Sequence, residues 1–279
     1  MSDLARSIAT ALEARFGETF KIDETLSGLP ELLNQAAHRV HRRYQPRDVD
    51  ADLLRLLCAC ALSAPTKSDL QQGDILVVRE RAKIEAIAAL IPDMPWIAQA
   101  AVFLIFLGNG RRLPQIAKLR GKPFPNDHLD LFFNATVDAA IVLAQFVRAA
   151  EAAGLGCCPI SVIRDHAQTI AEMFALPEKV VPVAGLCLGW PAEEGMMSAR
   201  LPLSVRVHEE RFGEDGLEAK IDAYDRRRAA LRPYRTQRDP ARFGETGFYG
   251  WSEDKARQYA VPQRADFGAF VRRQGFRLE

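Results

Sequence analysis

Residues 127–153, with the sequence DHLDLFFNATVDAAIVLAQFVRAAEAA, decide the fold of this chain more than any other stretch. The segment predicts a long helix whose side chains are apolar nearly all the way round. A helix with so little polar surface must be covered on every side. In a chain of 279 residues this indicates a central helix, and a partner subunit could share in covering it. Gly154 and Gly156 predict where the helix ends.

Shorter segments of alternating type surround this helix. Asp50 predicts the start of one helix, while Gly17 and Pro65 predict the ends of two others. Short apolar runs between polar turns predict strands that are buried on both faces. The alternation indicates a layered α+β or α/β domain. The predicted helices are 3–16, 30–43, 51–64, 81–90, 127–153 and 165–175, with two more within 252–275, and the predicted strands are 74–79, 101–107, 157–160 and 180–190.

The composition is that of an ordinary globular protein. Hydrophobic residues make up 48% of the chain and charged residues 26%, which excludes a disordered protein. Lys and Arg total 37 against 36 Asp and Glu, and this balance argues against nucleic-acid binding by the whole molecule. The longest apolar run, residues 100–108, has only the length of a strand, so we expect no membrane span. The first 16 residues lack the apolar core of a signal peptide.

Cysteine and histidine residues form no recognisable metal or redox motif. The cysteines are odd in number and contain no C-x-x-C pair, which favours small buried side chains in a reduced, cytoplasmic protein. The histidines do not cluster with each other or with cysteines, so we expect no metal site. The five cysteines are Cys58, Cys60, Cys157, Cys158 and Cys187.

Four polar segments could carry chemistry. They are HRVHRRY at 38–44, SAPTKSDLQQ at 63–72, GLGCCPIS at 154–161 and GLCLGWPAEEGMMSARLP at 185–202. Arginines near a helix end can converge on one anion, because each guanidinium presents a fork of donors that matches phosphate oxygens. Each segment also has a plain structural interpretation: a solvated basic face, a cap with its turn, a helix end before a strand, and a surface arginine after a loop. No G-x-G-x-x-G or P-loop motif is present.

In their order and spacing, these segments resemble the nitroreductase family of FMN enzymes, and most closely its oxygen-insensitive NADPH nitroreductase and flavin reductase branch. The similar stretches are HRVHR, APTKSDLQ, AAEAAGLG and GLCLGWP with the nearby RLP, of which the last is the most specific. The resemblance implies an α+β, nitroreductase-like fold with a central mixed β-sheet wrapped by helices, in an intertwined homodimer. We expect an N-terminal helical extension at 1–30, an FMN-binding domain at 31–230, and a basic loop with helices at 231–279 packed on that domain.

The resemblance also implies which residues bind FMN. Residues of the first segment and Arg200 would hold the phosphate and ribityl chain, the second segment would line the flavin edge, and the third would pack against the ring from the partner subunit. No catalytic side chain is implied, because the flavin carries the reaction. The implied residues are His38, Arg39, Val40, Arg42, Pro65, Thr66, Lys67, Asp69, Gln71, Pro159, Ile160, Ser161 and Arg200.

Three positions depart from the family pattern. Val40 stands where the family usually has serine, Asp69 where smaller nitroreductases have asparagine, and Ser198 where a lysine often precedes the final arginine. Each departure removes or inverts a polar contact that would favour an anionic cofactor. We expect Lys67 to compensate for the charge of Asp69, and Lys67 or Arg42 to stabilise negative charge on the reduced flavin.

The implied activity is ping-pong, two-electron hydride transfer from NADPH or NADH to a nitroaromatic, a quinone or a flavin. Residues 226–242 contain seven arginines and one acid. Arg232, Arg235 and Arg238 in this segment are candidates for the extra phosphate of NADPH, the alternative being a solvated mobile loop. Two other functions stay open: a different flavin chemistry on the same fold, namely reductive dehalogenation or flavin fragmentation, and a flavin-free module that binds nucleic acid through the basic segment.

Overall fold

The computed structural model describes residues 1–279, which divide into two compact units. The sheet unit comprises residues 39–196 and 264–279, and the helical unit comprises residues 1–38 and 197–263. Only the sheet unit contains strands that pair into a sheet.

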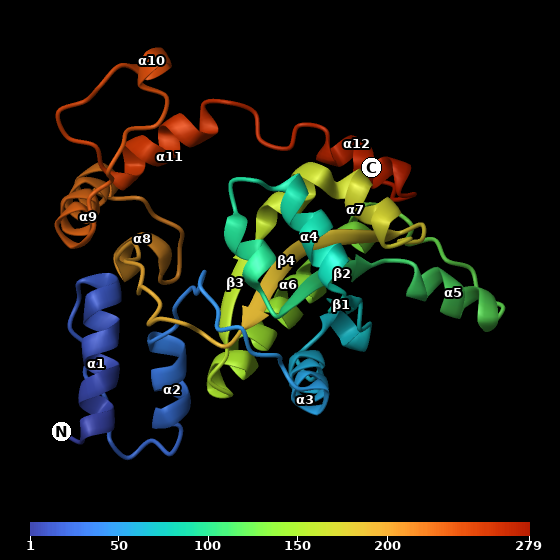
Figure 1. Ribbon diagram of the computed structural model, residues 1–279, viewed down its shortest axis with the longest axis horizontal. Helices are drawn as coiled ribbons and strands as arrows, with labels where there is room; N and C mark the ends of the chain where they lie inside the picture. The colour runs from blue at the N-terminus through green and yellow to red at the C-terminus, as the bar shows by residue number, and fades with distance from the viewer. The chain divides into compact units, whose positions relative to one another are not determined.

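The sheet has four strands in the order β1-β2-β4-β3 (Figure 1). Each neighbouring pair of these strands is antiparallel. The parallel pairing expected of a mixed sheet occurs at an isolated bridge between Val40 and Cys157, outside the four strands' own pairings. All four predicted strands are confirmed. Their bounds are β1 Gly73–Val78, β2 Val102–Asn109, β3 Gly156–Ile160 and β4 Val180–Gly189.

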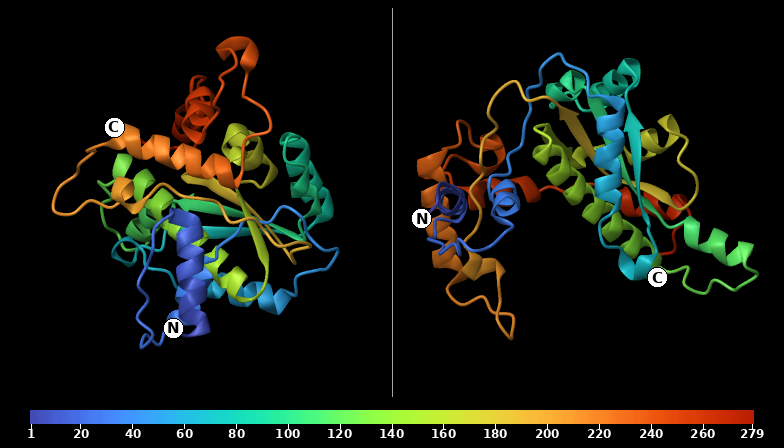
Figure 2. Two further views of the ribbon diagram at one scale, coloured as in Figure 1. Left: turned by 90° about the vertical axis from the view of Figure 1, so that its left-hand side faces the viewer. Right: turned by 90° about the horizontal axis from the view of Figure 1, so that it is seen from below.

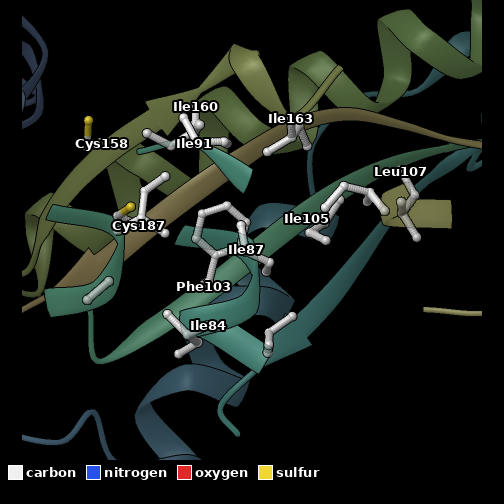
Figure 3. Close-up of a cluster of buried hydrophobic side chains, with 14 of the residues drawn as sticks. Ile84, Ile87, Ile91, Phe103, Ile105, Leu107, Cys158, Ile160, Ile163 and Cys187 are labelled. Carbon is white, nitrogen blue, oxygen red and sulfur yellow. The ribbon is translucent and has the colours of Figure 1, made fainter. Parts of the chain in front are cut away.

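The central strand β2 is apolar on both faces because helices cover both. Phe103 and Ile105 lie in the core beneath α4 (Arg81–Leu90) and next to Ile163 of η3 (Ser161–His166), as Figure 3 shows. Leu104 and Phe106 point to the opposite face, where they pack against α3 and α6. Further elements of the sheet unit are α3 Ala51–Leu62, η1 Lys67–Asp69, η2 Pro95–Gln99, α5 Arg112–Leu119, α6 Leu129–Ala152, α7 Ala167–Met173 and α12 Phe267–Arg273.

Helix α6 is the central helix that the sequence predicts, but this chain covers only part of it. Ala139 and Phe146 are fully buried against the sheet. On the other side Phe133 is 59% exposed, and Val137 and Ala140 are also exposed. By length and composition alone α6 could cross a membrane, but its buried face makes it a core helix of this fold.

Two predictions about helices are wrong. The helix expected over residues 30–43 ends at Ala36, since α2 covers Leu29–Ala36, and residues 38–44 are extended. Extended pairing wins there because the N–H of His41 donates to the carbonyl of Cys157 at 2.9 Å. The basic segment at 226–242 is not only turns, because α9 runs from Leu217 to Leu231.

The helical unit contains helices and no strands (Figure 2). Helix α1 (Asp3–Phe16) ends at Gly17, which has a φ of 73° as a left-handed cap requires, and this confirms the prediction. Helix α9 packs on α11 through the rings of Tyr224 and Trp251, whose centroids lie 5.3 Å apart. The remaining helices are α8 Leu203–Arg206, α10 Pro240–Phe243 and α11 Trp251–Tyr259.

The cysteines fall into two groups. Cys157, Cys158 and Cys187 are buried in strands β3 and β4, and burial raises the pKa of each thiol. Those three stay protonated and act as small apolar side chains. The prediction is wrong for Cys58, which is half-buried, and for Cys60, which is exposed, because α3 turns part of its surface to solvent.

Candidate functional site

The first predicted segment forms an extended strand-like stretch, with Val40 bridging both Cys157 and Met196. In an extended chain, residues three apart point to opposite sides. The sequence led us to expect Arg39 and Arg42 near the end of one helix, converging on one anion. Because the chain is extended here, they do not share a helix face. Val40 pairs here through its backbone, and a β-branched side chain favours such extended pairing.

Arg39 and Arg42 have different surroundings within the sheet unit. Arg39 forms an ion pair with Glu194 and donates from Nη1 to the carbonyl of Gly195 at 3.1 Å. The backbone N–H of Arg39 donates to the carboxylate of Glu151 at 3.3 Å. The guanidinium of Arg42 lies over the indole ring of Trp96, 5.0 Å from its centroid. Arg39 is thus held by three contacts, whereas Arg42 is exposed and kept in place by stacking.

The second segment, residues 65–72, is a strained loop. Ser68, Asp69 and Gln71 have φ values of 48°, 57° and 51°, a region that residues with a Cβ rarely adopt. Such strain persists only where the surroundings enforce it, and it concentrates at functional sites.

Asp138 of helix α6 enforces this conformation. The side chain is fully buried, and its two oxygens accept hydrogen bonds from the backbone N–H groups of Lys67 and Gln72, each at 3.0 Å. Arg112 donates to the carbonyl of Gln71 from the other side of the loop and binds Asp74 at 2.6 Å. Asp138 therefore fixes both ends of the loop.

The loop turns its polar side chains outward. Lys67 donates from Nζ to the hydroxyl of Ser68 at 3.0 Å, and Gln71 donates from Nε2 to Asp69 at 3.0 Å. Lys67 and Asp69 do not form an ion pair, so the expected compensation does not take the form of direct contact. Pro65 is exposed and Thr66 accepts a hydrogen bond at 3.4 Å from the N–H of Gln71. The loop thus presents an amine, an amide and a carboxylate to solvent.

The third segment lies at the end of strand β3, where side chains alternate. Pro159 and Ser161 are exposed, while Ile160 is 1% exposed and packs in the core with Phe103. The exposed pair can contact a bound group or a partner chain. Ile160 can do so only through its backbone.

His38 and Arg200 belong to the helical unit, where both are bound to Arg15. The carbonyl of His38 accepts a hydrogen bond from Nη2 of Arg15 at 2.6 Å, and the N–H of Arg200 donates to the carbonyl of Arg15 at 2.7 Å. The guanidinium of Arg200 is half-buried, forms no ion pair, and makes one long bond of 3.4 Å to the carbonyl of Ala199.

The chemistry of these residues fits FMN. A phosphate monoester binds best to arginine forks and histidine, which the helical unit offers at His38 and Arg200 and the sheet unit at Arg39 and Arg42. The edge of a flavin carries both carbonyl acceptors and an N–H donor. The loop at 65–72 presents both kinds of partner, in the cation of Lys67 and the amide of Gln71.

Sequence reasoning missed the residues that fix the predicted segments, namely Arg15 and Arg227 in the helical unit and Glu151 and Asp138 in the sheet unit. Of these, Asp138 left a signal, because it is a lone acid in the otherwise apolar run TVDAAIV. A charged residue on the buried face of a helix needs a partner, and that requirement could have identified it. Arg15 and Arg227 left none, since each lies near other charged residues in the sequence of its helix.

Comparison with known proteins defines the class to which this fold and site belong. Residues 36–190 match the model of the nitroreductase family, and residues 198–279 match the model of the nitroreductase family, C-terminal domain. Together the two ranges cover most of the chain, which therefore belongs to the nitroreductase family.

Individual relatives support the same assignment. The chain is 30% identical over 246 residues to an FMN reductase [NAD(P)H] of Bacillus subtilis, covering 87% of this chain and 96% of the relative. It is also 30% identical over 244 residues to an oxygen-insensitive NADPH nitroreductase of Salmonella typhimurium, covering 86% of this chain and 95% of the relative. Among solved structures, B. megaterium NfrA2 aligns with a TM-score of 0.81 and 30% identity, covering 89% of this chain and 98% of that one.

Proposed function

We propose that this chain is an FMN-dependent NAD(P)H oxidoreductase that reduces nitroaromatics, quinones or flavins. The observation that carries the proposal is the strained loop at 65–72, whose outward polar side chains are fixed by the buried Asp138. Membership of the nitroreductase family supports it, as do the names of the FMN reductase and the NADPH nitroreductase that it resembles.

When bound, FMN supplies the hydride-transfer chemistry, and the chain binds and orients it. As the resemblance implies, His38 and Arg200 of the helical unit and Arg39 and Arg42 of the sheet unit would hold its phosphate and ribityl chain. Lys67 and Gln71 would bind the flavin edge, with Pro65, Thr66 and Asp69 lining it, and the charge of Lys67 would stabilise negative charge there. Reductant and acceptor would occupy the same place in turn, so ping-pong kinetics are expected. No protein nucleophile or acid–base pair is needed.

The proposed enzyme is a homodimer in which α6 lies at the interface. The exposed residues Phe133, Val137 and Ala140 lie three or four positions apart, so they form one apolar stripe on this helix. Leu56 and Leu62 of α3, which packs on α6, are also exposed, at 58% and 50%. Exposed large apolar side chains on two helices that pack together indicate an interaction site. Pro159 and Ser161 would then reach the flavin of the partner subunit.

The purified protein is expected to be yellow, with FMN released on denaturation. Without oxygen, NADPH or NADH should bleach the flavin absorbance, and addition of a quinone or nitroaromatic should restore it. A colourless protein that does not take up added FMN would contradict the proposal and favour a flavin-free module. Flavin consumed during turnover, or halide released from a halogenated aromatic, would instead indicate different chemistry on the same fold.

We further propose that Arg232, Arg235 and Arg238 of the arginine-rich segment bind the extra phosphate of NADPH. The backbone there is held in place, because Arg257 donates from Nη1 to the carbonyls of Arg238 at 3.0 Å and Gly244 at 2.9 Å. Arg232 and Arg235 are exposed and form no ion pair. Arg238 is also exposed, but it is already paired with Asp254 at 3.5 Å.

Replacing Arg235 and Arg238 together by alanine should raise the apparent KM for NADPH about tenfold, and that for NADH much less. The reason is that a charge-assisted hydrogen bond to phosphate contributes roughly 1.5 kcal/mol, and NADH lacks this phosphate. Steady-state kinetics with each reductant measures both values. Arg226→Ala, an exposed arginine on α9, is the matched control. Equal changes in KM for the two reductants would rule out the phosphate contact.

A further inference from the structure

Arg15, near the end of helix α1, is a buried arginine whose side chain binds backbone carbonyls. It is 6% exposed. Its guanidinium donates to the carbonyl of Ala36 from both Nε and Nη2 at 3.1 Å, to that of His38 at 2.6 Å and to that of Ser198 at 3.2 Å. One side chain therefore joins the start of the first predicted segment, at Ala36 and His38, to Ser198, which lies just before Arg200.

A second arginine, Arg227 of helix α9, binds the backbone of both Arg15 and Arg200. Its Nη2 donates to the carbonyl of Arg200 at 2.7 Å and to that of Arg15 at 3.2 Å, while Nη1 donates to the carbonyl of Ala14 at 3.3 Å. The N–H of Arg200 donates to the carbonyl of Arg15 at 2.7 Å. Both peptide groups of Arg200, before and after its Cα, are thereby fixed.

The end of α1 is shaped to admit Arg227. A Cβ at Gly17 would lie 2.7 Å from Cδ of Arg227 and 2.8 Å from Nε, closer than real Cβ contacts. Glycine at this position thus provides both the left-handed cap and the space for the guanidinium. Helix α1 lies outside both ranges that match the family models, so this arrangement depends on a part of the chain that the family pattern does not describe.

We propose that Arg15 and Arg227 are positioning residues for the phosphate of FMN, acting through the backbone of His38 and Arg200. The inference rests on the proposed function, in which His38 and Arg200 bind that phosphate. The planar guanidinium groups of Arg15 and Arg227 bind several carbonyls each and so set the distance between the backbone at His38 and the backbone at Arg200. A flexible lysine ammonium cannot reproduce the paired hydrogen bonds of a guanidinium. The role of α1 is then to hold the phosphate site in its binding geometry before the cofactor arrives.

The test compares FMN with riboflavin, which has the same ring and ribityl chain but no phosphate. Binding of each to apoprotein is followed by quenching of flavin fluorescence, and the ratio of the two dissociation constants isolates the phosphate contribution. Arg15→Met and Arg227→Met are expected to lower the preference for FMN about tenfold, the loss of roughly one phosphate contact. Riboflavin affinity should change less than twofold. Arg15→Lys, which keeps the charge and the buried stem, is expected to show a smaller loss of the same kind.

Matched controls lie on the same two helices. Arg6→Met on α1 and Arg226→Met on α9 remove exposed arginines whose carboxylate partners are Asp3 and Asp222, and should leave the ratio unchanged. Equal losses for FMN and riboflavin in the Arg15 and Arg227 variants would overturn the inference, because a merely structural role weakens both ligands.

Arg200→Ala separates this inference from the proposed function. If Arg200→Ala lowers the preference for FMN and the Arg15 and Arg227 variants do not, the positioning role is wrong and the phosphate site stands. If Arg200→Ala leaves the preference unchanged, the assignment of Arg200 to the phosphate is itself wrong, and the positioning role falls with it.

Discussion

Asp138→Asn is expected to weaken binding of FMN and riboflavin equally, by roughly 30-fold. The carboxylate accepts from two backbone N–H groups at the ends of the loop at 65–72. Asparagine has one carbonyl oxygen to accept a hydrogen bond, and its NH₂ group would face the other of the two backbone N–H groups. The loop would therefore lose about 2 kcal/mol of stabilisation. In the proposed site the loop would contact the flavin edge, which FMN and riboflavin share, so the two flavins should lose affinity equally. Fluorescence titration with each flavin measures the effect.

Asp130→Asn on the same helix is the control, because Asp130 is exposed and its carboxylate accepts a hydrogen bond only from Asn134. It should leave both dissociation constants unchanged. Hydrogen exchange in Asp138→Asn should speed up at residues 66–72 and stay unchanged in the strands. A lower melting temperature with unaltered flavin affinity would show that Asp138 supports the fold and not the site.

Ala140→Glu is expected to convert the proposed dimer to a single chain of 31.1 kDa and to remove most of the bound FMN. Ala140 lies between Val137 and Ala144 on the exposed apolar stripe of α6. In a two-fold interface each substitution occurs twice, and each buried carboxylate without a partner costs several kcal/mol. Flavin should be lost together with the dimer, because Pro159 and Ser161 are expected to reach the site of the partner.

Ala89→Glu provides the same substitution at an exposed alanine of α4, which covers the opposite face of the sheet. Light scattering after size-exclusion chromatography should give twice the chain mass for this control. The interface would have to be placed elsewhere if Ala140→Glu also ran at twice the chain mass with its flavin intact.

The parts of this fold that the sequence predicted are those where local pattern and burial agree. Local sequence alone predicts three of these features, and the structure confirms them: the apolar helix α6, the helix start at Asp50 and the helix end at Gly17. The helix over 30–43 failed because the partners of residues 38–44 lie more than 100 residues away, at Cys157 and Met196. Tertiary backbone pairing with a strand outweighs the intrinsic helical propensity of these residues.

The candidate site divides in the same way. Its outward polar residues were predictable because their motifs are contiguous, as in APTKSDLQ. The groups that fix those residues were not, since Asp138 and Arg15 act on backbone atoms that carry no sequence signal. A pattern of side chains shows what could touch a ligand, whereas the geometry of the site depends on carbonyl and N–H groups that every residue possesses.

Helix α6 has a consequence for how the protein would behave at low concentration. On one side it carries Asp138, which fixes the loop at 65–72, and on the other the stripe with Val137 and Ala140. In a dimer built on this helix, subunit exchange and cofactor retention become linked equilibria, because loss of the neighbour removes the support of the same helix that anchors the loop. Dilution alone would then release flavin, and excess flavin would hold the two chains together.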